Sequence, residues 1–256
     1  MSEDSYYRLE SVPTFEAIYG KGLISLGGYD AVDEMVAGLT LKDQRLLDIG
    51  SGIGGIAHHL AEKYGAVVWG LDVFDWMAEY AKQNAPDAVR DRVIFITYDA
   101  QGAIPLPDDS IDLVYSNGTL TNVEDKQGLF AEVARVLQPG GQLCLIDWLA
   151  PSDLGKSTEQ LAFGDVSHKE TVSSYEALLA SCGFSDFTFQ DLSESYLGYV
   201  RDIQARLSDS AHIEQFSAVL SAKMRQQVID SHEQTAQAIE RGQQSSHRIL
   251  ATLLPS

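Results

Sequence analysis

The fold of this chain is most constrained by a glycine-rich turn, DIGSGIGG at residues 48–55, which separates a short apolar run from a helical segment. Glycine lets a backbone turn tightly and approach a ligand where a side chain would clash. Gly50, Gly52 and Gly55 fit the spacing G-x-G-x-x-G, and Asp72 follows 20 residues after Gly52, where an acid can bind ribose hydroxyls. Taken alone, the turn predicts a strand–turn–helix unit that binds a nucleotide-containing ligand, NAD included.

Short apolar runs alternate with amphipathic segments through the middle of the chain, which is typical of a parallel sheet covered by helices on both faces. The pattern predicts strands over residues 45–50, 66–73, 92–100, 111–117 and 141–148. It predicts helices over residues 55–65, 74–85 and 126–137. Pro139-Gly140-Gly141 is expected to close the last of these helices.

The two ends of the chain lie outside this alternation. Residues 1–40 carry a helical pattern around a glycine-bearing loop, YGKGLISLGG (19–28), which is long enough to cover a ligand. After the alternating region, the pattern predicts a helix over residues 173–184, a strand over 187–192 and almost continuous helix over 196–254.

Charge and hydropathy limit the possible partners. The chain has 256 residues with 18 Lys+Arg against 37 Asp+Glu, a formal charge of −19, so its field repels nucleic acids and anionic membranes. The N-terminus is acidic, and no apolar stretch of about 18 residues occurs, so we expect a cytoplasmic protein without a membrane partner. Cys144 and Cys182 lie in apolar surroundings without a CxxC pattern, which predicts neither a disulfide framework nor a metal site.

Three features of the alternating region resemble class I methyltransferases that depend on S-adenosylmethionine (SAM). Asp48 precedes the first glycine and completes D-x-G-x-G-x-G, which is similar to motif I of that family, where the acid helps to hold the methionyl amine of SAM. Asp99 ends the third predicted strand, where the family binds the adenine amino group. The segment LFAEVARVLQPGGQLCLIDW (129–148) is similar to the helix, Pro-Gly-Gly turn and strand that follow the fourth strand in the family.

The resemblance implies an α/β, Rossmann-like class I methyltransferase fold, with a mostly parallel seven-stranded sheet, N-terminal covering helices and a helical C-terminal cap. It implies SAM as cofactor and no metal. One domain, 1–256, would comprise an N-terminal lid (1–40), a cofactor-binding core (41–150) and a substrate-side and helical cap region (151–256). The cofactor-binding residues implied are Ile24, Ser25, Asp48, Gly50, Gly52, Asp72, Val73, Asp99, Ala100 and Ser116.

The loop at residues 19–28 is also similar to that of the phosphoethanolamine and the sarcosine and dimethylglycine N-methyltransferases. In that group the N-terminal segment folds over the cofactor. The resemblance places Ile24 and Ser25 against SAM and Tyr7 at the position of an active-site tyrosine.

The chain departs from that group at the residues that bind and activate the acceptor. Where the group carries an Arg-Asp pair and a catalytic His four residues later, this chain reads SNGTLTNV, with Asn117, Gly118 and Asn122. Asparagine cannot accept a proton near neutral pH, whereas histidine can. The positions expected to bind a phosphate read Leu161, Asp165 and Ser167, so the sequence argues against phosphoethanolamine as substrate.

What remains is a pocket of neutral polar groups and aromatic rings. Tyr7, Asn117 and Asn122 are the candidate catalytic residues, Tyr19 and Trp148 are expected beside them with Asp165 nearby, and His168 is the one candidate for a replacement base. Methyl transfer can proceed by positioning in a dry site when the acceptor is already neutral.

Three functions stay open at this point. The first is a transferase that methylates a small acceptor on nitrogen or oxygen in a specialised pathway. The second is an enzyme that consumes SAM itself, its amine attacking its own Cγ to give azetidine-2-carboxylate and methylthioadenosine. The third is an inactive SAM-binding partner subunit. The oligomeric state is left undetermined.

Overall fold

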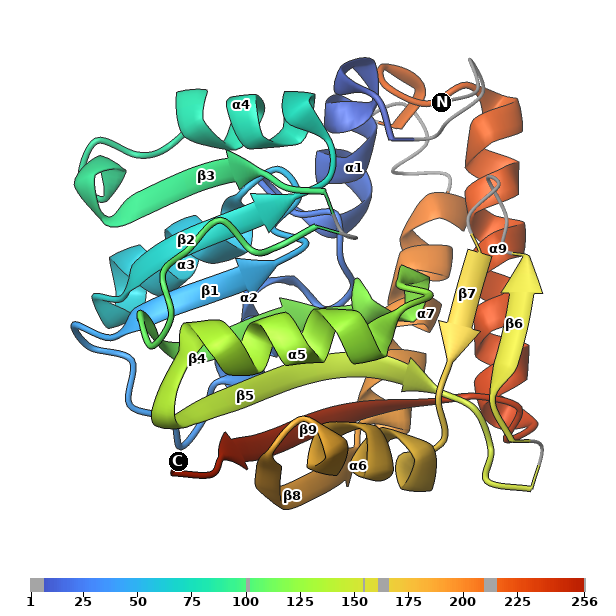
Figure 1. Ribbon diagram of the computed structural model, residues 1–256. Coiled ribbons are helices and arrows are strands. Elements are labelled where there is room, and N and C mark those ends of the chain that lie inside the picture. The colour runs from blue at the N-terminus through green and yellow to red at the C-terminus, as the bar shows by residue number, and fades with distance from the viewer. Residues whose placement is uncertain (1–6, 100–101, 154, 161–165, 210–215, 256) are drawn as a thin grey trace.

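The seven strands of the main sheet are arranged in the order β3-β2-β1-β4-β5-β9-β8 (Figure 1). The computed structural model describes residues 7–99, 102–153, 155–160, 166–209 and 216–255. The first five strands in this order, from β3 through β2, β1 and β4 to β5, run parallel. Strand β9 runs antiparallel to both β5 and β8. The mostly parallel sheet of seven strands confirms the predicted Rossmann-like fold. The strands are β1 Arg45–Ile49, β2 Val67–Asp72, β3 Val93–Thr97, β4 Ile111–Asn117, β5 Leu137–Leu149, β8 Phe184–Asp191 and β9 Ser245–Leu253.

Helices cover both faces of the sheet. Helices α5 and α6 pack on one face, and α2, α3 and α7 pack on the other, each through buried apolar side chains. Helix α4 packs over β2 and β3 at one edge. The helices are α1 Val12–Tyr19, α2 Gly28–Met35, α3 Gly55–Tyr64, α4 Asp75–Gln83, α5 Lys126–Val136, α6 Val172–Ser181, α7 Ser193–Ser208 and α9 Ala222–Glu240, with the short 3-10 turns η1 Leu9–Ser11, η2 Arg90–Arg92 and η3 Leu120–Asn122.

The last segment of the chain differs from the sequence prediction. Almost continuous helix was expected over residues 196–254, but helix ends at Glu240 and the chain returns as β9 between β5 and β8. Ile249 and Ala251 alternate inward to the core, and both edges of β9 are hydrogen-bonded to neighbouring strands. This non-local pairing overrides the helical preference of leucine and alanine in the segment.

Two smaller differences concern the region around β5. The helix predicted over 126–137 ends at Val136, and β5 begins at Leu137, so Pro139-Gly140-Gly141 lies inside the strand rather than in a closing turn. A two-stranded hairpin, β6 Ser157–Gln160 with β7 Val166–Lys169, was not predicted. Its strands are four residues long, too short to show a clear alternation in the sequence.

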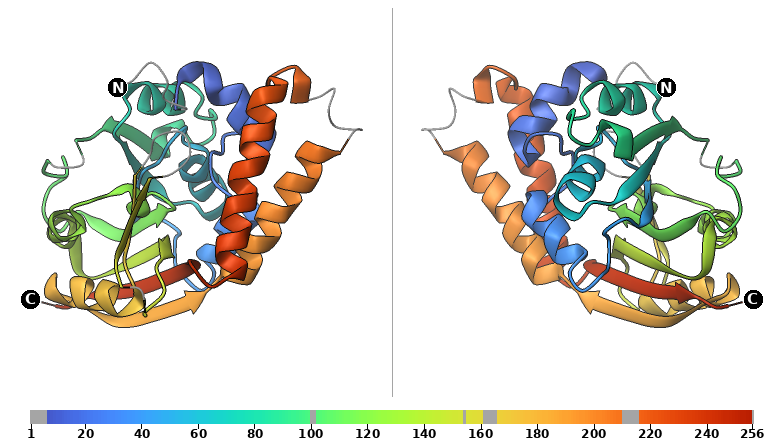
Figure 2. Two further views of the ribbon diagram at one scale, coloured as in Figure 1. Left: turned by 90° about the vertical axis from the view of Figure 1, so that its right-hand side faces the viewer. Right: turned by 90° about the vertical axis from the view of Figure 1, so that its left-hand side faces the viewer.

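The N-terminal helix and the two C-terminal helices pack against one another. Figure 2 shows α7 and α9 side by side, next to α1. Ile18 of α1, Leu207 of α7 and Val228 of α9 belong to one buried cluster. The Thr14 hydroxyl also donates to the Val219 carbonyl at 2.9 Å. The beginning and end of the chain therefore cover the same side of the core. Of the helices in the described ranges, none has both the length and the apolar character that crossing a membrane requires.

Candidate functional site

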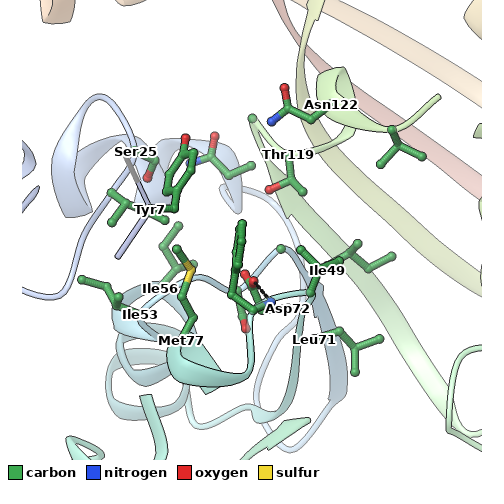
Figure 3. Close-up of a pocket in the computed structure, with 18 of the residues that line it drawn as sticks. Tyr7, Ser25, Ile49, Ile53, Ile56, Leu71, Asp72, Met77, Thr119 and Asn122 are labelled. Atoms are coloured by element: carbon green, nitrogen blue, oxygen red, sulfur yellow. Dashed lines mark hydrogen bonds between the residues drawn. The ribbon is translucent and has the colours of Figure 1, made fainter. Parts of the chain in front are cut away.

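A cavity of about 740 Å³ opens at the carboxyl ends of β1, β2, β4 and β5, beneath the N-terminal loop (Figure 3). Its volume is within the range of about 300–1,000 Å³ typical of small-molecule sites. Figure 3 shows Tyr7, Ser25 and Met77 on one side, with Thr119 and Asn122 on the other. Such a position, outside the carboxyl ends of parallel strands, is where open α/β sheets bind their ligands.

The glycine-rich turn forms the floor of the cavity. The Gly50 N–H donates to the Leu71 carbonyl at 2.8 Å, which ties the turn to β2. Gly50 has φ +76°, and a Cβ built on it would lie 2.1 Å from Oγ1 of Thr119. Gly52 has φ +54°, and its Cβ would lie 2.6 Å from Cδ1 of Ile24. Both positions therefore require glycine, Gly50 lining the cavity and Gly52 lying just behind its wall.

Asp72 presents a carboxylate at the end of β2. Its Oδ2 accepts from the Gly52 N–H at 2.8 Å, and its Oδ1 accepts from the Phe74 N–H at 3.0 Å. Burial raises the pKa of Asp72, and the backbone N–H groups oppose that rise. The carboxylate lines the cavity beside Val73, whose side chain is half exposed. Asp72 and Val73 thus lie where a ligand entering from the strand ends would meet them.

Asp48 lies behind the cavity wall. Its side chain is 2% exposed, and within the described part of the chain its Oδ2 has no hydrogen-bond partner. Burial, and after it the charge of Asp72, raises the pKa of Asp48 to about 8. A buried carboxylate without a partner is costly unless a positive group approaches it. The orphaned oxygen therefore fits a ligand that carries a cation.

The N-terminal loop closes over the glycine-rich turn. Ile24 and Ser25 line the cavity, and the Gly22 carbonyl accepts from the Gly55 N–H, the first residue of α3, at 3.1 Å. A Cβ on Gly55 would lie 2.1 Å from that carbonyl oxygen. In a dinucleotide site the N–H groups at this helix end receive the pyrophosphate. Here the protein itself occupies the first of them, which argues against NAD.

Two other predicted cofactor residues, Ser116 and Asp99, are absent from the described lining of the cavity. Ser116 is fully buried, and its hydroxyl donates to the Ile49 carbonyl at 2.7 Å, which braces β4 against β1. Asp99 is exposed beyond the end of β3. Ala100 lies outside the described residues. The structure therefore brings together Ile24, Ser25, Gly50, Asp72 and Val73.

The three candidate catalytic residues all line the cavity. The Tyr7 ring stacks on Phe74 with centroids 5.9 Å apart. Asn117 ends β4, and its Oδ1 accepts from the Tyr196 hydroxyl at 3.4 Å. Asn122 ends η3 and is exposed at the cavity. Their catalytic roles stay predictions.

An aromatic wall completes the side of the cavity away from Asp72. The rings of Trp148 on β5 and Tyr196 on α7 meet edge to face, with centroids 5.5 Å apart, and Tyr19 lines the same cavity. Sequence reasoning missed Tyr196, because its distance along the chain gave no signal that α7 packs beside β5. It missed Thr119 too, which shapes the turn through Gly50.

Few charges face the cavity. Apart from His168, the ionised groups among its described lining residues are the carboxylates of Asp72, Glu124 and Asp125, and none of those lining residues is lysine or arginine. Of the positions expected to bind phosphate in related enzymes, Ser167 is fully buried and does not line the cavity. Leu161 and Asp165 lie outside the described residues. Within the described ranges, no group of three potential ligands gathers to hold a metal.

Comparison with known proteins identifies the relatives of this chain. Residues 47–145 match the model of a methyltransferase domain. Phosphoethanolamine N-methyltransferase from Triticum aestivum is 31% identical over 201 residues, which are 75% of this chain and 38% of that protein. Sarcosine/dimethylglycine N-methyltransferase from Halorhodospira halochloris is 29% identical over 204 residues, 73% of each chain. The chain thus spans well under half the length of the plant relative.

Solved structures show the same fold. Phosphoethanolamine N-methyltransferase 2 from Haemonchus contortus, in complex with phosphomonomethylethanolamine and S-adenosylhomocysteine, superposes with a TM-score of 0.83 at 22% identity. The match covers 98% of this chain and 59% of that one.

Proposed function

We propose that the chain is a class I SAM-dependent methyltransferase that transfers the methyl group of SAM to a small acceptor carrying no phosphate. The charge of the cavity is the observation that supports an acceptor without phosphate. Its described lining residues include Asp72, Glu124 and Asp125 but no lysine or arginine. A phosphate dianion would enter that field without a cation to pair with.

The cofactor half of the proposal rests on the floor of the cavity. Asp72 would bind the ribose hydroxyls, and Ile24, Ser25 and Val73 would enclose the nucleoside. Asp48 would stabilise the ammonium group of SAM from behind the wall, because its Oδ2 is buried without a partner in the described part of the chain. The carboxylate of Asp72 in the cavity favours a ligand with a positive sulfonium, which supplies a strongly electrophilic methyl group.

The acceptor half rests on a second part of the lining, here named the acceptor wall, which consists of Asn117, Asn122, Trp148, His168 and Tyr196. Asn117 and Asn122 would orient the acceptor by hydrogen bonds, and Tyr7 would close the cavity over both ligands. Trp148 and Tyr196 offer ring surfaces that attract a cation or stack on an aromatic acceptor. Holding both reactants in line in a water-poor cavity accounts for much of the rate in such a displacement.

The test is a product analysis on the purified chain. SAM is incubated alone, with tyramine, with ethanolamine and with phosphoethanolamine, and the products are followed by mass spectrometry. We expect S-adenosylhomocysteine together with a methylated product from a phosphate-free acceptor, at a rate at least tenfold above that with phosphoethanolamine.

Two results would contradict the proposal. Methylthioadenosine formed from SAM alone would show that the enzyme consumes SAM by cyclisation or lysis. Tight binding of SAM without any product across the acceptors would favour a partner subunit that only binds the cofactor.

A further inference from the structure

The β6–β7 hairpin brings a histidine to the acceptor side of the cavity. Side chains alternate along a strand, and in β7 Val166 and His168 line the cavity while Ser167 and Lys169 are buried. His168 pairs with Thr158 of β6 in the hairpin register. Among the described lining residues it is the one imidazole.

One buried cation fixes this histidine beside η3. The Lys126 side chain, 3% exposed, donates from Nζ to the His168 carbonyl at 2.6 Å and to the Val123 carbonyl at 2.8 Å. Val123 directly follows Asn122, the last residue of η3, and β7 packs on η3. Lys126 therefore joins the backbone that carries His168 to the backbone that carries Asn122.

Buried acids balance the charge of Lys126 and secure the same wall. Asp147, 1% exposed, accepts from the Thr121 hydroxyl, and from the Tyr175 hydroxyl at 3.2 Å. Its attraction for Lys126, together with that of Glu170, opposes the lowering of the lysine pKa by burial. The network links η3, β5, β7 and α6, which together hold the acceptor wall in place.

We propose that His168 is the general base of methyl transfer, an inference that rests on the proposed function. The acceptor nitrogen or oxygen gives its proton to an imidazole nitrogen of His168, and its lone pair forms the new bond to the methyl carbon. The carbon–sulfur bond of SAM breaks, and its electron pair stays on sulfur, which becomes the thioether of S-adenosylhomocysteine. Lys126 is a positioning residue that acts through the His168 backbone.

Other groups in the cavity are less suited to this role. Asn117 and Asn122 cannot take up a proton. Asp72 is engaged by two backbone N–H groups, and Asp125 caps α5 by accepting from the Gly128 N–H at 2.9 Å. Carboxylates are in general weaker bases than imidazoles, and the imidazole is the side chain that proteins use most often as a general base.

Within the described residues, charged groups lie on several elements around His168. They are Glu124 and Asp125 before and at the start of α5, Lys126 on α5, Asp147 on β5, and Lys156, Glu159, Lys169 and Glu170 on or next to the hairpin.

The first arm of the test needs no turnover. Diethyl pyrocarbonate at about pH 6.5 modifies accessible neutral imidazoles, and peptide mapping locates the product. We expect His168 to be modified in the free protein and protected by tyramine in the presence of S-adenosylhomocysteine. Absence of modification, or of protection, would overturn the placement of His168 at the acceptor, whether or not the wild type shows activity.

The second arm measures turnover of SAM with tyramine and with ethanolamine. His168→Gln is expected to lower kcat by about 10²–10⁴-fold, and to remove the acidic limb of the pH–rate profile, with the SAM Kd unchanged. Lys126→Met should lower kcat more than it raises KM. His59→Gln is the matched control and should leave kcat unchanged. His59 lies on α3, outside the described lining of the cavity, and its Nε2 is 2.7 Å from Oδ1 of Asp33. His168→Gln retaining more than half of kcat, or an unchanged pH profile, would overturn the proposal. A wild type that forms no product counts against the proposed function, and the first arm still decides the placement of His168.

Discussion

Gly50 is a position in the floor of the cavity where the structure requires glycine. Gly50→Ala places a Cβ 2.1 Å from Oγ1 of Thr119, on a backbone with φ +76° that alanine rarely adopts. We expect the turn to shift and the SAM affinity, measured by isothermal titration calorimetry, to fall at least tenfold. Gly198→Ala on the exposed face of α7, where a Cβ meets nothing within 4 Å, is the control and should leave that affinity unchanged. Equal affinities for both variants would contradict the account of the turn.

Asp48 makes a testable contribution to the pH dependence of stability. Burial, followed by the charge of Asp72, raises its pKa from 3.8 to about 8. A carboxyl with a higher pKa in the folded state binds more protons there, so its stabilising contribution is full below about pH 4 and is lost as the pH rises through 8. Asp48→Asn stays neutral, so urea unfolding should show it gaining stability relative to wild type between about pH 5 and 8. A constant difference over that range would refute the assignment.

The Thr121 hydroxyl belongs to the hydrogen-bond network behind the acceptor wall. Thr121→Val removes the hydroxyl that donates to Oδ1 of buried Asp147 and leaves that oxygen with the Trp148 N–H alone among its described partners. Such a loss costs about 1–3 kcal/mol, so the free energy of unfolding should fall by that amount in urea titrations. Thr121→Ser keeps the hydroxyl and should recover most of it. A valine variant as stable as wild type would mean that the network does not hold η3 in place.

At the scale of elements, the N-terminal loop is locked to α3 by a pair of glycines. Gly55→Ala would place a Cβ 2.1 Å from the Gly22 carbonyl oxygen and break the 3.1 Å hydrogen bond between them. We expect faster hydrogen exchange over residues 19–27 and weaker SAM binding, because Ile24 and Ser25 lose their place over the turn. The Gly198→Ala variant again serves as control. Unchanged exchange in the loop would show that other contacts hold it.

The elements also show what the sequence could and could not predict. Motif I, Asp72 and the strands around them are local in the chain, so spacing alone places them. The sequence also named His168, but it gave no sign of the β6–β7 hairpin that carries this residue, whose strands are too short for a pattern. Tyr196 was missed because α7, which carries it, packs beside β5 across a long distance in sequence. Asp99 was expected at the cofactor from its strand-end position, yet it lies exposed outside the described lining of the cavity.

At the scale of the whole molecule, the two ends of the chain complete a cavity that the sheet only begins. The loop between α1 and α2 covers the glycine-rich turn, and α7 adds Tyr196 to the aromatic wall. Under the proposed function, the floor with Asp72 would take the nucleoside, and the wall with Asn122, Trp148 and His168 would take the acceptor. The formal charge of −19 extends the acidic character of the cavity to the molecule as a whole.

The most direct test of the central claim is a crystal structure of the protein with S-adenosylhomocysteine. We predict the ribose on the Asp72 carboxylate, the nucleoside between Val73 and Ile24, and the sulfur facing the wall of Asn122 and Trp148. Space between the sulfur and that wall would be left for an acceptor. S-adenosylhomocysteine bound elsewhere, or with its sulfur turned away from the wall, would contradict methyl transfer within this cavity.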